Sequence, residues 1–135
     1  MRIYQIRIFT EMVAQNPMML LTGFGLESSQ QYIEKKAKEH NLNPKYAEFN
    51  FHNQYVQTAA EMGILGFLVL IAMLYTNLKN ALKHKDFLHI AFSITMLMLF
   101  LSESFFCRQR GIVFFVVLYG LFNAYDDSKQ TVEQN

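Results

Sequence analysis

Apolar residues dominate the second half of the chain, whereas the first half mixes polar and apolar positions. Three runs contain no Asp, Glu, Lys or Arg, and they cover residues 63–78, 87–102 and 111–125. A helix needs about 20 residues to cross a hydrocarbon core of roughly 30 Å. The helices of a soluble bundle keep a polar face toward water, and these runs leave none. We therefore predict an all-α integral membrane protein with about three transmembrane helices, near residues 58–78, 87–107 and 111–125.

Shorter helices are expected before these runs. Apolar residues recur at helical spacing over residues 1–16, and this helix should end before Pro17, because the residue preceding a proline is pushed out of the α region. The Gly-Phe-Gly sequence of residues 23–25 predicts a turn, followed by a second helix over about residues 29–40. A third helix is expected to begin near Phe51 and to continue into the first membrane span.

The lysines of the 79–86 loop favour the cytoplasmic side of a membrane. Arg108 and Arg110, in the turn after the second apolar run, argue mildly for the opposite orientation. We place the 79–86 loop inside and the 103–110 turn outside. The expected parts of the chain are a helical periplasmic segment, a transmembrane part and a polar cytoplasmic tail, over residues 1–60, 61–125 and 126–135.

Composition adds few constraints. The 135 residues carry a net charge of +1, which gives no reason to expect a nucleic-acid partner. The single cysteine, Cys107, cannot form an internal disulfide and lacks the neighbours of a zinc site, so we interpret it as a small apolar residue at a helix end. His84 and His89 are expected at the cytoplasmic interface, and the histidines show no metal-ligand spacing.

The candidate chemistry lies in residues 51–66. On a helix that turns about 100° per residue, His52, Tyr55 and Gly63 share one face. Two interpretations remain open. Small residues on a membrane helix let a second helix approach closely, with His52 as an ordinary interfacial residue. Alternatively, the small residues on this face leave room for a lipid-linked substrate, and His52 lies at the entrance to that space as a general base.

The order of several motifs resembles the O-antigen ligase and polymerase superfamily, a group of bacterial inner-membrane glycosyltransferases. In chain order these motifs are Arg2, Pro17, Gly23-Phe24-Gly25, His52-Asn53, Glu61-Met62-Gly63 and Glu103. The resemblance covers essentially the whole chain, although the gap between Pro17 and Gly23 is a few residues longer than usual. It covers only the C-terminal part of a family member, because the earlier spans and a further arginine have no counterpart. We therefore expect a truncated, split or remnant protein that is inactive alone.

The resemblance implies transfer of a glycan from undecaprenyl diphosphate to an acceptor hydroxyl on the lipid A core, in lipopolysaccharide biosynthesis at the bacterial inner membrane. A repeat-unit polymerase, a protein-glycosylating ligase and a non-catalytic membrane remnant or subunit are the alternatives. It implies no cofactor and no metal. The implied partners are the lipid-linked glycan, the acceptor, membrane lipids and a chain that supplies the missing N-terminal spans.

The resemblance also implies roles for individual residues. His52 would deprotonate or orient the acceptor hydroxyl, and Arg2, with Arg7 as the second candidate, would hold the diphosphate through its forked donors. The implied substrate-binding set consists of Arg2, Arg7, Asn53, Tyr55 and Gly63. Glu61 and Glu103 are expected to pair with an arginine, and Arg108 and Arg110 are the candidates. A role as solvated or headgroup-contacting residues remains open for the arginines.

Overall fold

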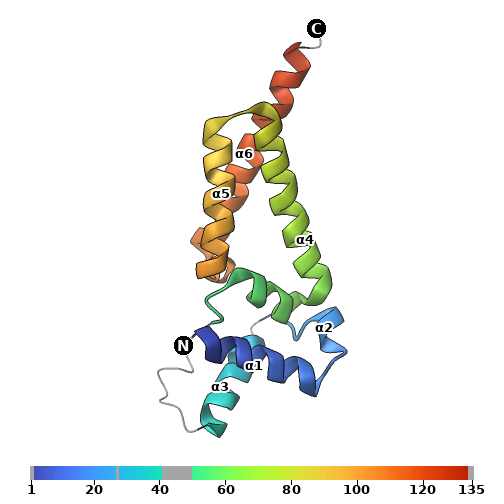
Figure 1. Cartoon of the computed structure of the whole chain (residues 1–135), viewed down its shortest axis with the longest axis vertical. Coiled ribbons are helices and arrows are strands. Elements are labelled where there is room, and N and C mark those ends of the chain that lie inside the picture. The colour runs from blue at the N-terminus through green and yellow to red at the C-terminus, as the bar shows by residue number, and fades with distance from the viewer. Residues whose placement is uncertain (1, 27, 41–49, 134–135) are drawn as a thin grey trace.

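Figure 1 shows a computed structural model, which describes residues 2–26, 28–40 and 50–133, with side chains for residues 6–26, 30–36, 38–40 and 50–125. The regular elements of the described part are all helical and include no strand, so the predicted all-α class is confirmed. Its elements are α1 (Arg2–Gln15), α2 (Met19–Thr22), α3 (Ser28–Glu39), α4 (Gln54–His84), α5 (Phe87–Ser102), the 3₁₀ turn η2 (Phe105–Cys107) and α6 (Gln109–Glu133).

Helices α1 to α3 lie together at one end of the molecule (Figure 1). Their buried contacts with the start of α4 form a small apolar cluster of Ile8, Met12, Ile33, Phe51 and Ala60. The ring of Phe9 meets the ring of Phe51 edge-on, with centroids 6.1 Å apart. The predicted helices over residues 1–16 and 29–40 are confirmed by α1 and α3. The four-residue helix α2 was not predicted, because so short a segment has no periodic signal.

Helices α4, α5 and α6 form a three-helix bundle with an aromatic core (Figure 1). Its buried members are Leu70, Leu74, Phe92, Met96, Phe100 and Phe115. Large apolar side chains also cover the outside of the bundle, and Leu65 is 69% exposed and Phe87 80% exposed. Such a surface marks contact with lipid or with other protein.

Among the described residues, α4 is the one helix long and apolar enough to cross a membrane, and α5 is apolar but shorter. Helix α5 stops at Ser102, before the predicted end at residue 107, because Glu103 is extended and η2 turns Phe105 and Phe106 back against Phe100. Helix α6 continues to Glu133 through the segment predicted as a polar tail. The predicted loop over residues 79–86 was also wrong, because α4 runs on to His84.

The connection between α4 and α5 is short and well capped. Lys85 adopts a left-handed conformation with φ 51°, which ends α4. Asp86 then caps α5, because its carboxylate accepts hydrogen bonds from the backbone amides of Leu88 and His89. This turn lies at the opposite end of the bundle from α1 to α3 (Figure 1).

The turn between α5 and α6 lies instead beside the N-terminal helices. The backbone amide of Asn53 donates to Oγ of Ser104 at 3.2 Å, which joins the head of α4 to this turn. The turn between α5 and α6 therefore lies at the same end of the bundle as α1 to α3, and the turn between α4 and α5 lies at the other end, as the predicted orientation requires. The side of the membrane that each end faces stays a prediction.

Candidate active site at the head of helix α4

Asn53 positions the start of α4. Its backbone is extended, and Oδ1 accepts a hydrogen bond from the amide of Val56 at 3.1 Å, which is the standard contact of an N-cap residue. Its Nδ2 donates to the carbonyl of Leu101 at 3.3 Å. Asn53 therefore both begins α4 and ties it to the end of α5. Its predicted substrate contact stays a prediction.

His52 lies just before the helix, in a backbone conformation that few residues other than glycine adopt. Its φ is 47°, and its backbone amide donates to Oδ1 of Asn50 at 3.1 Å. Its Nδ1 lies 3.5 Å from Oε2 of Glu103, and the two side chains are 29% and 53% exposed. The prediction that His52 and Gly63 share a helical face was wrong, because α4 begins at Gln54 and Gly63 breaks the helix.

The pair of His52 and Glu103 has the layout of a base and its orienting group. A distance of 3.5 Å is longer than a good hydrogen bond. A carboxylate beside Nδ1 favours the tautomer with its proton there, which makes Nε2 the basic nitrogen. This arrangement can remove a proton from a hydroxyl group.

Two open grooves flank this pair. The larger, of about 1020 Å³, has polar residues at one end, among them Asn50, Gln54 and Glu61, and apolar residues of α4 along its length. The smaller, of about 550 Å³, is lined by Glu103, Arg108 and Arg110 together with apolar side chains. Asn50 and Gln54, each two residues from His52 along the chain, line the larger groove, and its partner Glu103 lines the smaller. His52 itself is in the lining of neither groove, and its contact with Glu103 is its link to the smaller one.

The predicted pairing of Glu61 and Glu103 with an arginine stays a prediction. The carboxylate of Glu103 lies 3.5 Å from Nδ1 of His52. Glu61 accepts a hydrogen bond from Nε2 of Gln57. Arg108 and Arg110 are exposed and share the smaller groove with Glu103. The two arginines thus line the same groove as the partner of the candidate base.

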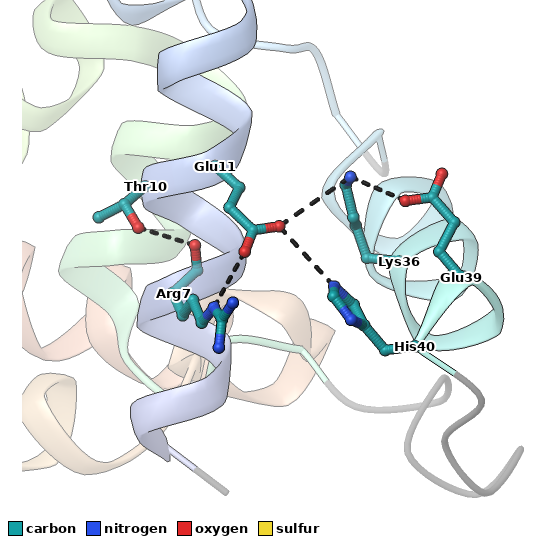
Figure 2. Close-up of polar contacts among 6 residues, drawn as sticks. All are labelled: Arg7, Thr10, Glu11, Lys36, Glu39 and His40. Atoms are coloured by element: carbon teal, nitrogen blue, oxygen red, sulfur yellow. Dashed lines mark hydrogen bonds and ion pairs between the residues drawn. The ribbon is translucent and has the colours of Figure 1, made fainter.

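Arg7 belongs to a separate cluster between α1 and α3. Its Nε donates to Oε1 of Glu11 at 3.0 Å, and Oε2 of Glu11 lies 4.0 Å from both Nζ of Lys36 and Nε2 of His40 (Figure 2). Lys36 also donates to Glu39 at 2.8 Å, which lowers the pKa of Glu39 and raises that of Lys36. The side chain of Arg2 lies outside the described residues, so its predicted role stays a prediction.

Tyr55 and Gly63 contact protein in the described structure. The hydroxyl of Tyr55 donates to the carbonyl of Leu97 at 3.3 Å, and its ring packs edge-on against Phe100. Gly63 lies against the backbone of Leu21 and Gly23. The structure therefore gives both residues a packing role, and their substrate contacts remain untested predictions.

Cys107 lines the larger groove, close to Glu61. Desolvation by the surrounding protein, and then the negative charge of Glu61, raise the pKa of its thiol. A raised pKa keeps the thiol protonated and unreactive at neutral pH.

Sequence reasoning missed a buried polar network at the far end of the bundle. Asn77 donates to Oγ of Ser93 at 2.7 Å, and its Oδ1 lies 3.0 Å from Nε2 of His89 and accepts from Nδ2 of Asn123 at 3.2 Å. His89 is 0% exposed and stacks on Phe122, so its predicted interfacial position was wrong. The detectable signal was a polar Asn77 and Ser93 within otherwise apolar runs.

Within the described ranges, no group of three His, Cys, Asp or Glu side chains is arranged to hold a metal ion.

The family model for O-antigen ligases matches residues 1–71, more than half of the chain. No curated protein and no solved structure gives a significant match. The matched region includes His52, Asn53, Glu61 and Gly63, while Glu103 lies beyond it. The chain therefore belongs to the O-antigen ligase family.

Proposed function

We propose that this chain carries the acceptor-activating part of an O-antigen ligase-type glycosyltransferase, which moves a glycan from undecaprenyl diphosphate to a hydroxyl of the lipid A core. The observation that carries the proposal is the pairing of His52 with Glu103 at 3.5 Å, at the head of α4, where Glu103 lines the smaller groove. Family membership supports the reaction class. The base, its orienting carboxylate and the grooves support the placement of the chemistry.

The proposed step is a displacement at the anomeric carbon of the donor glycan. The acceptor oxygen forms a bond to that carbon while the bond from carbon to the diphosphate oxygen breaks. Nε2 of His52 takes the proton of the acceptor hydroxyl, and Glu103 orients the imidazole. The diphosphate leaves with the electron pair and requires cationic donors.

Arginines are the proposed diphosphate donors. Arg2 keeps the role that its position in the family motif implies. Arg108 and Arg110 line the smaller groove beside Glu103 and can supply forked donors there. Arg7 is less well placed for this role, because Glu11 already holds its guanidinium.

The larger groove is the proposed place of the lipid-linked substrate. Its amide and hydroxyl side chains suit the sugar hydroxyls of a glycan, and Leu65, Val69 and Met73 offer an apolar wall along α4 for an isoprenoid chain, while the diphosphate lies toward Arg108 and Arg110 of the smaller groove. In this proposal α4, α5 and α6 cross the bacterial inner membrane, and residues 1–60 face the periplasm. Membrane lipids and a chain that supplies further spans would complete the surroundings of the bundle.

A transfer assay with undecaprenyl-diphosphate-linked glycan and a lipid A core acceptor tests the proposal. The full chain would be assayed in membranes with and without a candidate partner that supplies the earlier spans, and we expect activity only with the partner. His52→Gln should then reduce transfer by about 10²–10⁴-fold, the usual contribution of a general base. Glu103→Gln should reduce it less, because the imidazole remains.

His84→Gln is the matched control, because His84 lies at the other end of the same helix, and it should leave transfer unchanged. Full transfer by His52→Gln at equal membrane abundance would remove the proposed base. Transfer to a growing repeat unit or to a protein, rather than to lipid A core, would identify the polymerase or the protein-glycosylating ligase instead. No transfer by the wild-type chain in any combination would favour a non-catalytic subunit.

A further inference from the structure

Helix α4 is broken at Gly63, within a segment that is otherwise helical. Gly63 has φ 67° and ψ −165°, far from helical values. In a continuous helix the carbonyls of Ala60 and Glu61 accept hydrogen bonds from the amides of Ile64 and Leu65. With these angles at Gly63 the backbone leaves the helical path, and other donors reach the two carbonyls.

The loop between α2 and α3 supplies both donors. The amide of Phe24 donates to the carbonyl of Ala60 at 2.7 Å, and the amide of Gly25 donates to the carbonyl of Glu61 at 3.1 Å. The loop therefore replaces, bond for bond, two hydrogen bonds that the helix would otherwise make within itself. The bent helix and a straight helix satisfy the same two carbonyls with different partners.

Glycine is required on both sides of this contact. A β-carbon at Gly23 would overlap the carbonyl of Glu61, and one at Gly63 would overlap the carbonyl oxygen of Leu21. Both glycines also have positive φ, which strains any L-residue with a side chain. Gly25 has φ 93° but open space around it, so a side chain there meets strain without overlap.

The contact lies beside one wall of the larger groove. The loop leads directly into Leu26 and Gln30, which line the groove on the side of α3. Residues of α4 on both sides of the break, including Glu61 and Leu65, line the same groove. The width of the groove therefore depends on how the loop is held against α4.

We propose that residues 23–25 form a backbone clasp that holds α4 broken at Gly63 and so keeps the wall of Leu26 and Gln30 on the larger groove. Release of the clasp lets α4 close its own hydrogen bonds and detaches that wall. Gly23 and Gly63 are thus positioning residues for the ligand of the groove. The identity of that ligand, a lipid-linked glycan, rests on the proposed function, whereas the clasp itself rests on the backbone contacts.

Hydrogen exchange of single amides in the full chain, reconstituted in lipid nanodiscs, tests the clasp. In the wild-type chain the amides of Phe24 and Gly25 should exchange as slowly as helical amides of α4, although they lie in a loop. Gly63→Ala should speed their exchange about tenfold or more, as expected when a local opening loses a hydrogen bond. The amides of Ile64 and Leu65 should become slower in the same variant, because the straightened helix gives them partners.

This reciprocal exchange of protection separates the clasp from general destabilisation, which would speed all four amides. Gly120→Ala is the matched control, because Gly120 is helical with no neighbouring atom in the way, and it should leave all four unchanged. Gly25→Ala should fall between the two. Rapid exchange of Phe24 and Gly25 in the wild-type chain would overturn the proposal without any variant, and unchanged protection in Gly63→Ala would overturn it too.

The transfer assay gives a second readout. Gly63→Ala should raise KM for the lipid-linked donor more than it lowers kcat, because the groove changes while His52 and Glu103 remain. Loss of transfer in His52→Gln with normal exchange at Phe24 and Gly25 would support His52 as the base and show that the clasp does not depend on it. Normal transfer by His52→Gln would end the proposed function and leave the exchange test of the clasp intact.

Discussion

Removal of the Asn77 amide is expected to destabilise the bundle far more than a change at the neighbouring surface position. Asn77 is 0% exposed, and its side chain joins Ser93 and His89 of α5 to Asn123 of α6. Asn77→Ala removes one hydrogen-bond partner from each of the other three side chains. Ser93 and His89 of α5 are almost fully buried, so water does not easily replace the lost contacts.

The magnitude follows from the number of contacts. Hydrogen bonds between membrane helices contribute about 0.6 kcal/mol on average and up to about 1.7 kcal/mol. Three such contacts, together with the small cavity left by the truncation, give an expected loss of about 2–4 kcal/mol. Thr76→Ala is the control, because Thr76 is exposed and bonds mainly to the backbone of its own helix, and it should cost about 0.5 kcal/mol or less.

Reversible unfolding in mixed detergent micelles measures both free energies. A double-mutant cycle of Asn77→Ala with Ser93→Ala should give a coupling energy of about 0.5 kcal/mol or more, because the two side chains share a bond of 2.7 Å. A loss for Asn77→Ala equal to that of Thr76→Ala would refute the reasoning. It would mean that the packing of aromatic rings alone sets the register of α4, α5 and α6.

Two further predictions concern the N-terminal half. Asn53→Ala should cost about 1 kcal/mol of stability through the lost N-cap, seen as faster exchange of the Val56 amide, and unchanged exchange there would show that Asn53 does not cap α4. The pKa of Glu39 is lowered by its bond to Lys36, which joins two residues of α3, so its contribution to the stability of α3 is present above the ordinary pKa of a glutamate and is lost as the pH falls through the lowered value. Acid titration followed by the amide NMR shifts of α3 should therefore report fraying of its last turn as the Glu39 carboxylate is protonated, and Glu39→Gln should remove that dependence; an identical profile in the variant would contradict it.

Local sequence pattern was sufficient for most of the helices. Pro17 predicted the end of α1, the turn at residues 23–25 preceded the predicted α3, and the uncharged runs predicted the bundle, because each signal depends on residues close together in the chain. The ends of α5 and α6 were less predictable. Whether Phe105 and Phe106 continue a helix or fold back depends on Phe100 and Phe115 across the bundle.

The details of the site depend on contacts distant in sequence. The partner of His52 is Glu103, and the break at Gly63 depends on the loop at residues 23–25. Glycine is common inside membrane helices, so its presence at position 63 does not mark a break. The burial of His89 likewise depends on Asn77, in the preceding helix. The motif order identified the family, but the tertiary contacts determine what each motif residue touches.

We expect the imidazole of His52 to stand at the outer surface of the membrane, at the head of a helix that crosses it. Single-cysteine variants in a Cys107→Ser background test this directly with a membrane-impermeant maleimide added to cells whose outer membrane alone is permeabilised. His52→Cys should react from outside, whereas Lys85→Cys, at the far end of α4, should react only after the inner membrane is lysed. Reaction of Lys85→Cys from outside, with His52→Cys protected until lysis, would place the candidate base in the cytoplasm and contradict the account.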